Sequence, residues 1–373
     1  MNDKSDSKKR SILGGACFWL FVILFFSLVL FFAASELFSV KISNEMENLA
    51  TKPENNKISV LPPLDTATYD KKLNELANNP PDPIVYETVN VPLSPQPKIA
   101  HLWPVKTVYP NAGAILPFNR IVAYYGNLYS KNMGALGQYD EEEMFRRLDV
   151  EIKKWKTAAP ATPVIPALHY IAVVAQGSAG EDKKYRARMP DSEIAKVLKM
   201  AEKIDALVFL DIQVGLSDLR TEVPLLEKYF KMPRVHLGID PEFSMKNGIS
   251  PGKIVGTFDA SDINFTVNYL TKIVKENNLT PKILVVHRYT QKMVTNYKEI
   301  KPLPEVQVVM HMDGWGERAK KINTYKQFIF KEPVQFTGFK LFYKNDTLTD
   351  GTVLMTPNDL LKLSPKPIYI QYQ

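Results

Sequence analysis

The stretch LVFLDIQVG at residues 207–215 is a short apolar run that contains β-branched residues and carries an aspartate and a glutamine near its end. The stretch VHLGIDPEF at 235–243 has the same form. Short apolar runs that alternate with longer amphipathic segments are typical of parallel strands in βαβ units. These two stretches therefore predict two buried parallel strands.

The same alternation extends over residues 116–373. Eight runs are predicted as strands, at 120–126, 164–174, 207–214, 235–239, 253–258, 283–286, 306–312 and 336–342. Amphipathic patterns at 140–156, 192–204 and 261–277 predict helices between them, with Asp140 and Ser261 as N-caps. An α/β chain of this kind and size predicts a (β/α)8 barrel.

An open, doubly wound sheet is the alternative fold. Such a sheet usually carries a glycine-rich phosphate loop after its first strand. Here Tyr124-Tyr125-Gly126-Asn127 follows instead, which favours the barrel. The predicted connection at 241–252, between the fourth and fifth strands, is short for a full helix.

The N-terminal forty residues predict a membrane anchor. Residues 11–40 carry no charge except Glu36, and an apolar stretch of about 20 residues can span a bilayer as a helix. Lys8, Lys9 and Arg10 precede it, so we expect residues 1–10 to be a cytoplasmic tail and the remainder to lie outside the cytoplasm. A cleaved signal peptide, cut near Ala34, is the alternative.

Residues 41–115 are rich in Pro, Asn, Lys and Asp, which predicts a linker before the barrel domain at 116–373. A short helix at 70–78 and an edge strand at 84–91 are expected inside this linker.

Composition excludes several classes of site. The single cysteine, Cys17, lies in the apolar run, so the rest of the chain has no disulfide, zinc-thiolate site or cysteine nucleophile. The net charge of +7 comes from Lys and Arg scattered among Asp and Glu, which does not favour nucleic-acid binding.

Polar side chains occupy the predicted strand ends, where the active sites of (β/α)8 barrels lie. Four carboxylates are the candidate catalytic residues, Asp211, Asp240, Glu242 and Asp313. Pro241 is expected to hold Asp240 and Glu242 extended and facing the same way, because side chains two apart share a face of a strand. Clustered carboxylates cannot all stay ionised, so one can act as an acid while its neighbour acts as a base, as glycoside hydrolysis requires.

Further polar and aromatic residues near the strand ends are candidate substrate-binding residues. They are Tyr124, Tyr125, Asn127, His169, Gln213, His287, Arg288, Trp315 and Lys340. His287 and Arg288 are expected to bind an anionic group together, and Trp315 is expected to stack against a sugar ring. Alternative structural roles are a hydrogen-bonded core position for His169 and a cover over the core for Trp315.

No metal site or other cofactor is predicted. The four carboxylates could instead hold a hard divalent ion, since oxygen ligands suit magnesium, calcium or manganese. No His-x-His or His-Glu-x-x-His spacing occurs, which disfavours a zinc hydrolase.

Several segments together carry a family resemblance. They are YYGN at 124–127, PALH at 166–169, FLDIQVG at 209–215, DPEF at 240–243, VVHR at 285–288 and GFKLFY at 338–343. With them, the chain from about residue 118 resembles a family of bacterial exported or lipoprotein-like proteins. The resemblance implies a barrel related to glycoside hydrolases and implies no particular activity. The Asn-Glu pair and the later Glu typical of barrel glycosidases are replaced by Pro241-Glu242 and Asp313.

Two functions follow as hypotheses. The first is a membrane-anchored, extracytoplasmic glycoside hydrolase or related carbohydrate-active enzyme that acts on an envelope glycan. The second is a non-catalytic surface protein that binds a glycan or another envelope polymer in the same pocket.

Overall fold

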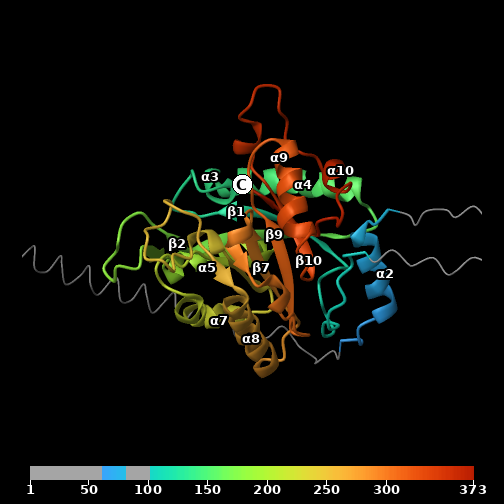
Figure 1. Ribbon diagram of the computed structural model, residues 1–373, viewed down its shortest axis with the longest axis horizontal. Helices are drawn as coiled ribbons and strands as arrows, with labels where there is room; N and C mark the ends of the chain where they lie inside the picture. The colour runs from blue at the N-terminus through green and yellow to red at the C-terminus, as the bar shows by residue number, and fades with distance from the viewer. Residues whose placement is uncertain (1–60, 81–100) are drawn as a thin grey trace, which may run out of the picture. The chain divides into compact units, whose positions relative to one another are not determined.

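The computed structural model describes residues 61–80 and 101–373, and its centre is a closed ring of parallel strands (Figure 1). The barrel strands are β1 (Arg120–Gly126), β2 (Val164–Ala175), β4 (Leu207–Ile212), β5 (Val235–Ile239), β7 (Lys282–Arg288), β9 (Val306–Met312), β10 (Phe336–Leu341) and β11 (Tyr369–Tyr372). They are paired in this order, and β1 pairs in parallel with both β2 and β11. That double pairing closes the ring and confirms the predicted eight-stranded α/β barrel.

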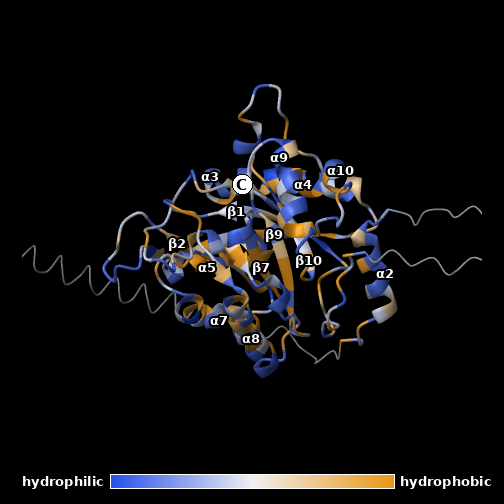
Figure 2. Ribbon diagram, viewed as in Figure 1, coloured by the Kyte–Doolittle hydropathy of each residue, from blue (hydrophilic) through white to orange (hydrophobic). Residues whose placement is uncertain are grey.

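Helices surround the ring and alternate with most of its strands in the chain. The α-helices are α2 (Thr66–Ala77), α3 (Ala135–Gln138), α4 (Glu141–Ala158), α5 (Asp191–Lys203), α6 (Leu219–Glu222), α7 (Glu227–Phe230), α8 (Ala260–Glu276), α9 (Arg318–Tyr325) and α10 (Pro357–Leu360). Figure 2 shows apolar residues along central strands such as β7, while α4 and α8 carry both polar and apolar residues. The helices are thus amphipathic and bury one side against the barrel.

Shorter elements complete the connections. They are β3 (Arg186–Arg188), which pairs antiparallel with β2, and the 3-10 or π-helical turns η1 (Pro224–Leu226), η2 (Pro241–Phe243), η3 (Gln291–Met293), η4 (Tyr297–Glu299), η5 (Lys326–Phe330) and η6 (Asn345–Thr347). Between β7 and β9 the chain forms only η3, η4 and the short strand β8 (Val294–Thr295), without an α-helix.

Two strands differ from the prediction. The run at 253–258 is not a barrel strand, because only Phe258 and Asp259 form β6, which pairs with β8 outside the barrel. Glycine and proline at 248–252 make turns here, and Ile254 is exposed. This explains why the predicted connection at 241–252 was too short for a helix. The missing barrel strand is β11, at the end of the chain.

The two long helices α4 and α8 each begin at an aspartate whose side chain accepts a backbone hydrogen bond. Asp140 accepts a hydrogen bond from the Glu143 amide at 2.9 Å and begins α4 as predicted. The cap of α8 is Asp259, which accepts from the Ser261 amide at 3.0 Å, so the prediction of Ser261 as the cap is wrong. Asp259, two residues earlier, is an equally favoured cap residue, and it forms a capping box with Asp262.

The barrel interior is apolar at the N-terminal end of the strands, and α2 covers this end. The interior cluster takes side chains from seven of the eight barrel strands, among them Ile121, Phe209 and Val285, and it includes Tyr69 of α2. Leu73 and Leu76 of the same helix pack against the cluster. Part of the segment predicted as a linker is therefore in contact with the N-terminal end of the barrel.

Other predictions for the N-terminal part concern residues that are not described. The anchor at 11–40, the tail before it and the edge strand at 84–91 lie outside the described residues. Within residues 61–80 and 101–373, no helix has both the length and the apolar character needed to cross a bilayer.

Candidate functional site

A cavity of about 650 Å³ opens at the C-terminal end of the barrel strands. Three of the four candidate catalytic carboxylates line it, Asp240, Glu242 and Asp313. Four of the candidate binding residues line it as well, Tyr125, Gln213, Trp315 and Lys340. The closed ring thus brings side chains from five strands or their following loops to one volume.

Asp240 and Glu242 enter the cavity from a tight turn after β5. Pro241 to Phe243 form the 3-10 turn η2, and Asp240 caps it by accepting the Glu242 amide at 3.0 Å. The prediction of an extended Asp240-Pro241-Glu242 segment is therefore wrong. Both carboxyls still reach the cavity because the cap fixes the start of the turn while Glu242 projects from its middle.

A buried chain of charges links the neighbouring strands β10, β9 and β7. Asp313 binds Lys340 through Oδ1 at 2.9 Å and His287 through Oδ2 at 2.9 Å. The Lys340 ammonium lies 3.7 Å from the centre of the Tyr125 ring. Lysine and aspartate are almost never buried unless they are paired, and this arrangement pairs both.

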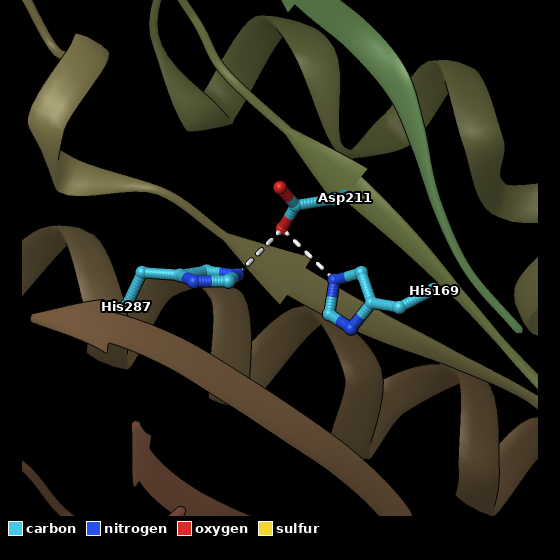
Figure 3. A group of neighbouring side chains, drawn as sticks. All are labelled: His169, Asp211 and His287. Carbon is cyan, nitrogen blue, oxygen red and sulfur yellow. Dashed lines mark ion pairs between the residues drawn. The ribbon is translucent and has the colours of Figure 1, made fainter. Parts of the chain in front are cut away.

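Asp211 lies directly beneath the cavity and is fully buried. Tyr125 donates a hydrogen bond from its hydroxyl to Oδ2 of Asp211 at 3.0 Å. Nε2 of His169 and Nε2 of His287 approach the other oxygen, Oδ1, at 3.2 and 3.3 Å (Figure 3). Figure 3 shows both imidazoles directed at the same carboxylate oxygen.

The carboxyls that line the cavity differ in pKa. Burial raises the pKa of Glu242, as does the negative charge of Asp313, while a hydrogen bond from Tyr289 and the charge of Lys340 lower it less. Burial also raises the pKa of Asp240 well above its usual range. Asp313 is buried too, but Lys340 and His287 outweigh that burial and bring its pKa below the usual range.

The two histidines beneath the cavity differ in the same way. Burial lowers the pKa of His287, but the charges of Asp211 and Asp313 outweigh it and raise the value to about 10. Burial lowers the pKa of His169 to about 4, although Asp211 raises it in part. In the absence of a bound metal ion, His287 is thus a cation and His169 is neutral at pH 7.

Trp315 stands at the rim of the cavity, where 49% of its surface is exposed. The ammonium of Lys320 lies 4.7 Å from its ring centre. Gln213 sits deeper, where its amide nitrogen is 3.4 Å from both the Tyr125 hydroxyl and Asp240 Oδ2.

Five residues predicted to bind substrate do not line the cavity: His169 and His287, which lie with Asp211 beneath it, and Arg288, Tyr124 and Asn127. Arg288 follows His287 on β7 and so points away from the axis, where it pairs with Glu332 at 2.6 Å. Tyr124 likewise points away, and its hydroxyl bonds that of Tyr343 at 2.9 Å. Asn127 donates to the Ile171 carbonyl at 2.9 Å and has a structural role in the turn after β1.

Other residues of the site were not predicted. Tyr289 lines the cavity and donates a hydrogen bond to Glu242. Tyr369 and Gln371, on the overlooked strand β11, contact Nδ1 of His169 at 2.6 and 3.1 Å. The alternation of Tyr369, Gln371 and Gln373 at the end of the sequence was the signal that could have shown them.

Comparison with known proteins gives no family. No family model and no curated protein matches the chain. Among solved structures, the chain is similar to a tri-modular GH5 (subfamily 4) endo-beta-1,4-glucanase from Bacillus licheniformis complexed with cellotetraose, with 12% identity and a TM-score of 0.36. That match covers 69% of this chain and 54% of the glucanase chain, so this chain spans about half of its length.

Two other solved structures are similar to this chain with comparably low sequence identity. One is a Bacteroides ovatus GH5 xyloglucanase in complex with a XXXG heptasaccharide, with 13% identity, a TM-score of 0.29, and coverage of 60% of this chain and 61% of that one. The other is a GH5-4 broad specificity endoglucanase from Bacteroides salanitronis, with 11% identity, a TM-score of 0.31, and coverage of 59% and 75%.

Proposed function

We propose that the barrel is a carbohydrate-active enzyme that hydrolyses glycosidic bonds in a glycan of the cell envelope. The observation that carries the proposal is the pair of unlike carboxyls in one cavity. Glu242 is half-buried and has a raised pKa, whereas Asp313 is held ionised by its contacts with Lys340 and His287. Acid and base chemistry on one substrate needs carboxyls in these two states.

The roles of the two groups follow from their surroundings. Glu242 donates its proton to the leaving glycosidic oxygen as the C–O bond breaks, which is the general-acid step. Asp313 supplies the second carboxylate, and its negative charge stabilises the cationic character that develops at the anomeric carbon. A water molecule completes the reaction by adding hydroxyl to that carbon and returning a proton to Glu242.

The cavity also fits a sugar in size and lining. Its volume of about 650 Å³ lies within the range of about 300–1,000 Å³ usual for small-molecule sites. Trp315 offers an exposed indole at the rim, and Gln213, Tyr289 and Asp240 offer hydrogen-bonding groups deeper inside. An aromatic face beside a few polar groups suits a ring that is apolar on its faces and polar at its edge.

The N-terminal sequence supports a position of the barrel outside the cytoplasm. The apolar stretch at 11–40, with Lys8, Lys9 and Arg10 before it, supports a single-pass anchor that places the barrel outside the cytoplasm. An envelope glycan is the carbohydrate that such a position makes accessible.

The test uses the full-length protein with cell-wall and exopolysaccharide fractions. The wild type should release reducing ends, and Glu242→Gln should release them at least about 100-fold more slowly, since general acids contribute about 10²–10⁴-fold. Glu181→Gln, a change at an exposed glutamate outside the cavity, is the matched control and should keep the wild-type rate.

Two outcomes contradict the hydrolase. One is equal release by the wild type and Glu242→Gln. The other is binding of the fractions without any release, which would support a non-catalytic glycan-binding protein instead. Calorimetry with the double variant Asp211→Asn, Glu242→Gln identifies that binder, because its affinity would be unchanged.

A further inference from the structure

Three buried side chains beneath the cavity converge on one point. One nitrogen of His169, one oxygen of Asp211 and one nitrogen of His287 all lie within 4.8 Å of one another (Figure 3). The residues are fully buried. In residues 61–80 and 101–373, this is the one group of His, Cys, Asp or Glu with the spacing of metal ligands.

The converging atoms meet one another as ion pairs and bond no other group. Nε2 of His169 and Nε2 of His287 lie 3.2 and 3.3 Å from Oδ1 of Asp211, and none of the three atoms has a further hydrogen-bond partner in the described part of the chain. Buried polar atoms are nearly always hydrogen-bonded, and three that have polar contacts only with one another call for a shared partner. We propose that His169, Asp211 and His287 bind a divalent transition-metal ion.

The distances suit one ion held by three ligands. Ligands about 2.0–2.2 Å from one ion lie about 3.0–3.4 Å apart when their bonds make angles of about 90–110°. The spacing of Asp211 Oδ1 from each imidazole nitrogen, 3.2 and 3.3 Å, falls in this range. Two imidazoles and one carboxylate suit zinc and its transition-metal neighbours, whereas calcium and magnesium prefer ligands that are all oxygen.

Each ligand is oriented by a second group, as at known metal sites. Nδ1 of His287 contacts Asp313 at 2.9 Å, and Nδ1 of His169 contacts the Tyr369 hydroxyl at 2.6 Å. The second oxygen of Asp211 accepts the Tyr125 hydroxyl at 3.0 Å. These contacts leave Nε2 of both histidines and Oδ1 of the aspartate directed at the proposed ion, which displaces the Nε2 proton of His287.

Gly238 keeps one side of the cluster open. A Cβ at this position would lie 2.3 Å from Asp211 Oδ1 and 2.4 Å from His169 Nε2. Any side chain on β5 at this point would therefore occupy the space beside the ligands.

The inference does not rest on the proposed hydrolase, because none of the three ligands lines the cavity. Full-length protein, purified in detergent and stripped with EDTA, is titrated with Zn²⁺ by calorimetry and with Co²⁺ by visible absorption. We expect one ion per chain. His169→Gln, His287→Gln and Asp211→Asn should each weaken binding at least about 100-fold. Asp211→Asn keeps the side-chain shape, so it remains informative if a histidine variant misfolds.

His236→Gln is the matched control. His236 is a buried barrel histidine whose Nε2 also lacks a partner among the described residues, but it lies outside the cluster and its Nδ1 accepts the Ile283 amide at 3.1 Å. This variant should bind Zn²⁺ within about threefold of the wild type, and Zn²⁺ should raise the thermal midpoint of both. No binding by the wild type, or equal binding by Asp211→Asn and the wild type, would overturn the inference.

Discussion

Replacing Lys340 with methionine should destabilise the barrel by removing one partner of a buried ion pair. Lys340 is 2% exposed and its Nζ lies 2.9 Å from Asp313 Oδ1. Methionine keeps most of the apolar contact with Tyr125, so the change removes mainly the charge. Asp313 would then stay buried with a single ionic partner, His287.

The expected loss is about 3 kcal/mol. Breaking a buried pair costs about 3–5 kcal/mol because it leaves an uncompensated charge. We expect the lower end of that range because His287 remains 2.9 Å from the other oxygen of Asp313. At about 2 °C per kcal/mol for a chain of this size, the thermal midpoint should fall by about 6 °C.

Urea unfolding in the presence of EDTA measures the loss without a contribution from bound metal. Asp313→Asn and the double variant complete a cycle, in which the coupling between the two positions should be about 2 kcal/mol. Lys320→Met, at an exposed lysine that also lines the cavity, is the control and should change stability by less than about 0.5 kcal/mol. Equal effects of Lys340→Met and Lys320→Met, or a coupling near zero, would refute the reasoning.

Three other changes test separate parts of the structure. Trp315→Ala should raise KM for the glycan about 10-fold and leave the thermal midpoint unchanged, because the indole is exposed; a lower midpoint would show a packing role instead. Gly238→Ala should cost about 1–3 kcal/mol through its 2.3 Å approach to Asp211, whereas Gly177→Ala, with nothing within 4 Å, should be neutral in the same unfolding assay. Asp240→Asn should stabilise the protein more at pH 7 than at pH 4. The folded chain holds the proton of the Asp240 carboxyl more tightly than the unfolded chain does, so the wild type loses stability as pH rises from about 4. Equal gains in stability at both pH values would contradict the raised pKa of Asp240.

Most barrel strands could be predicted from sequence because buried parallel strands are short, apolar runs. Residues 253–258 misled the prediction, since Ile254 and Val255 resemble part of a strand but follow a turn and are exposed, and of the large apolar side chains in this run only Phe258 is buried. The strand β11 was missed because it has only four residues and contains a single aliphatic residue, Ile370. Ring closure supplies neighbours on both sides of β11, and that stabilisation is invisible in a local pattern.

The site was predictable in part for the same reason. Polar residues at strand ends indicated the cavity, and Asp240, Glu242 and Asp313 do line it. The sequence could not show which side chains point into the barrel where two adjacent residues of a strand are both polar or aromatic. Arg288 beside His287 is such a position, and a shift of one residue exchanges the barrel interior for the helix side.

The pH dependence of kcat/KM is the most direct test of Glu242 as an acid that shares one cavity with groups from distant strands. The rate should fall on the alkaline side as Glu242 loses its proton, and this fall should be absent in Glu242→Gln. Because the charge of Lys340 lowers the pKa of Glu242, Lys340→Met should move the fall to higher pH. An alkaline fall at the same pH in the wild type and Lys340→Met, or one that persists in Glu242→Gln, would contradict the account.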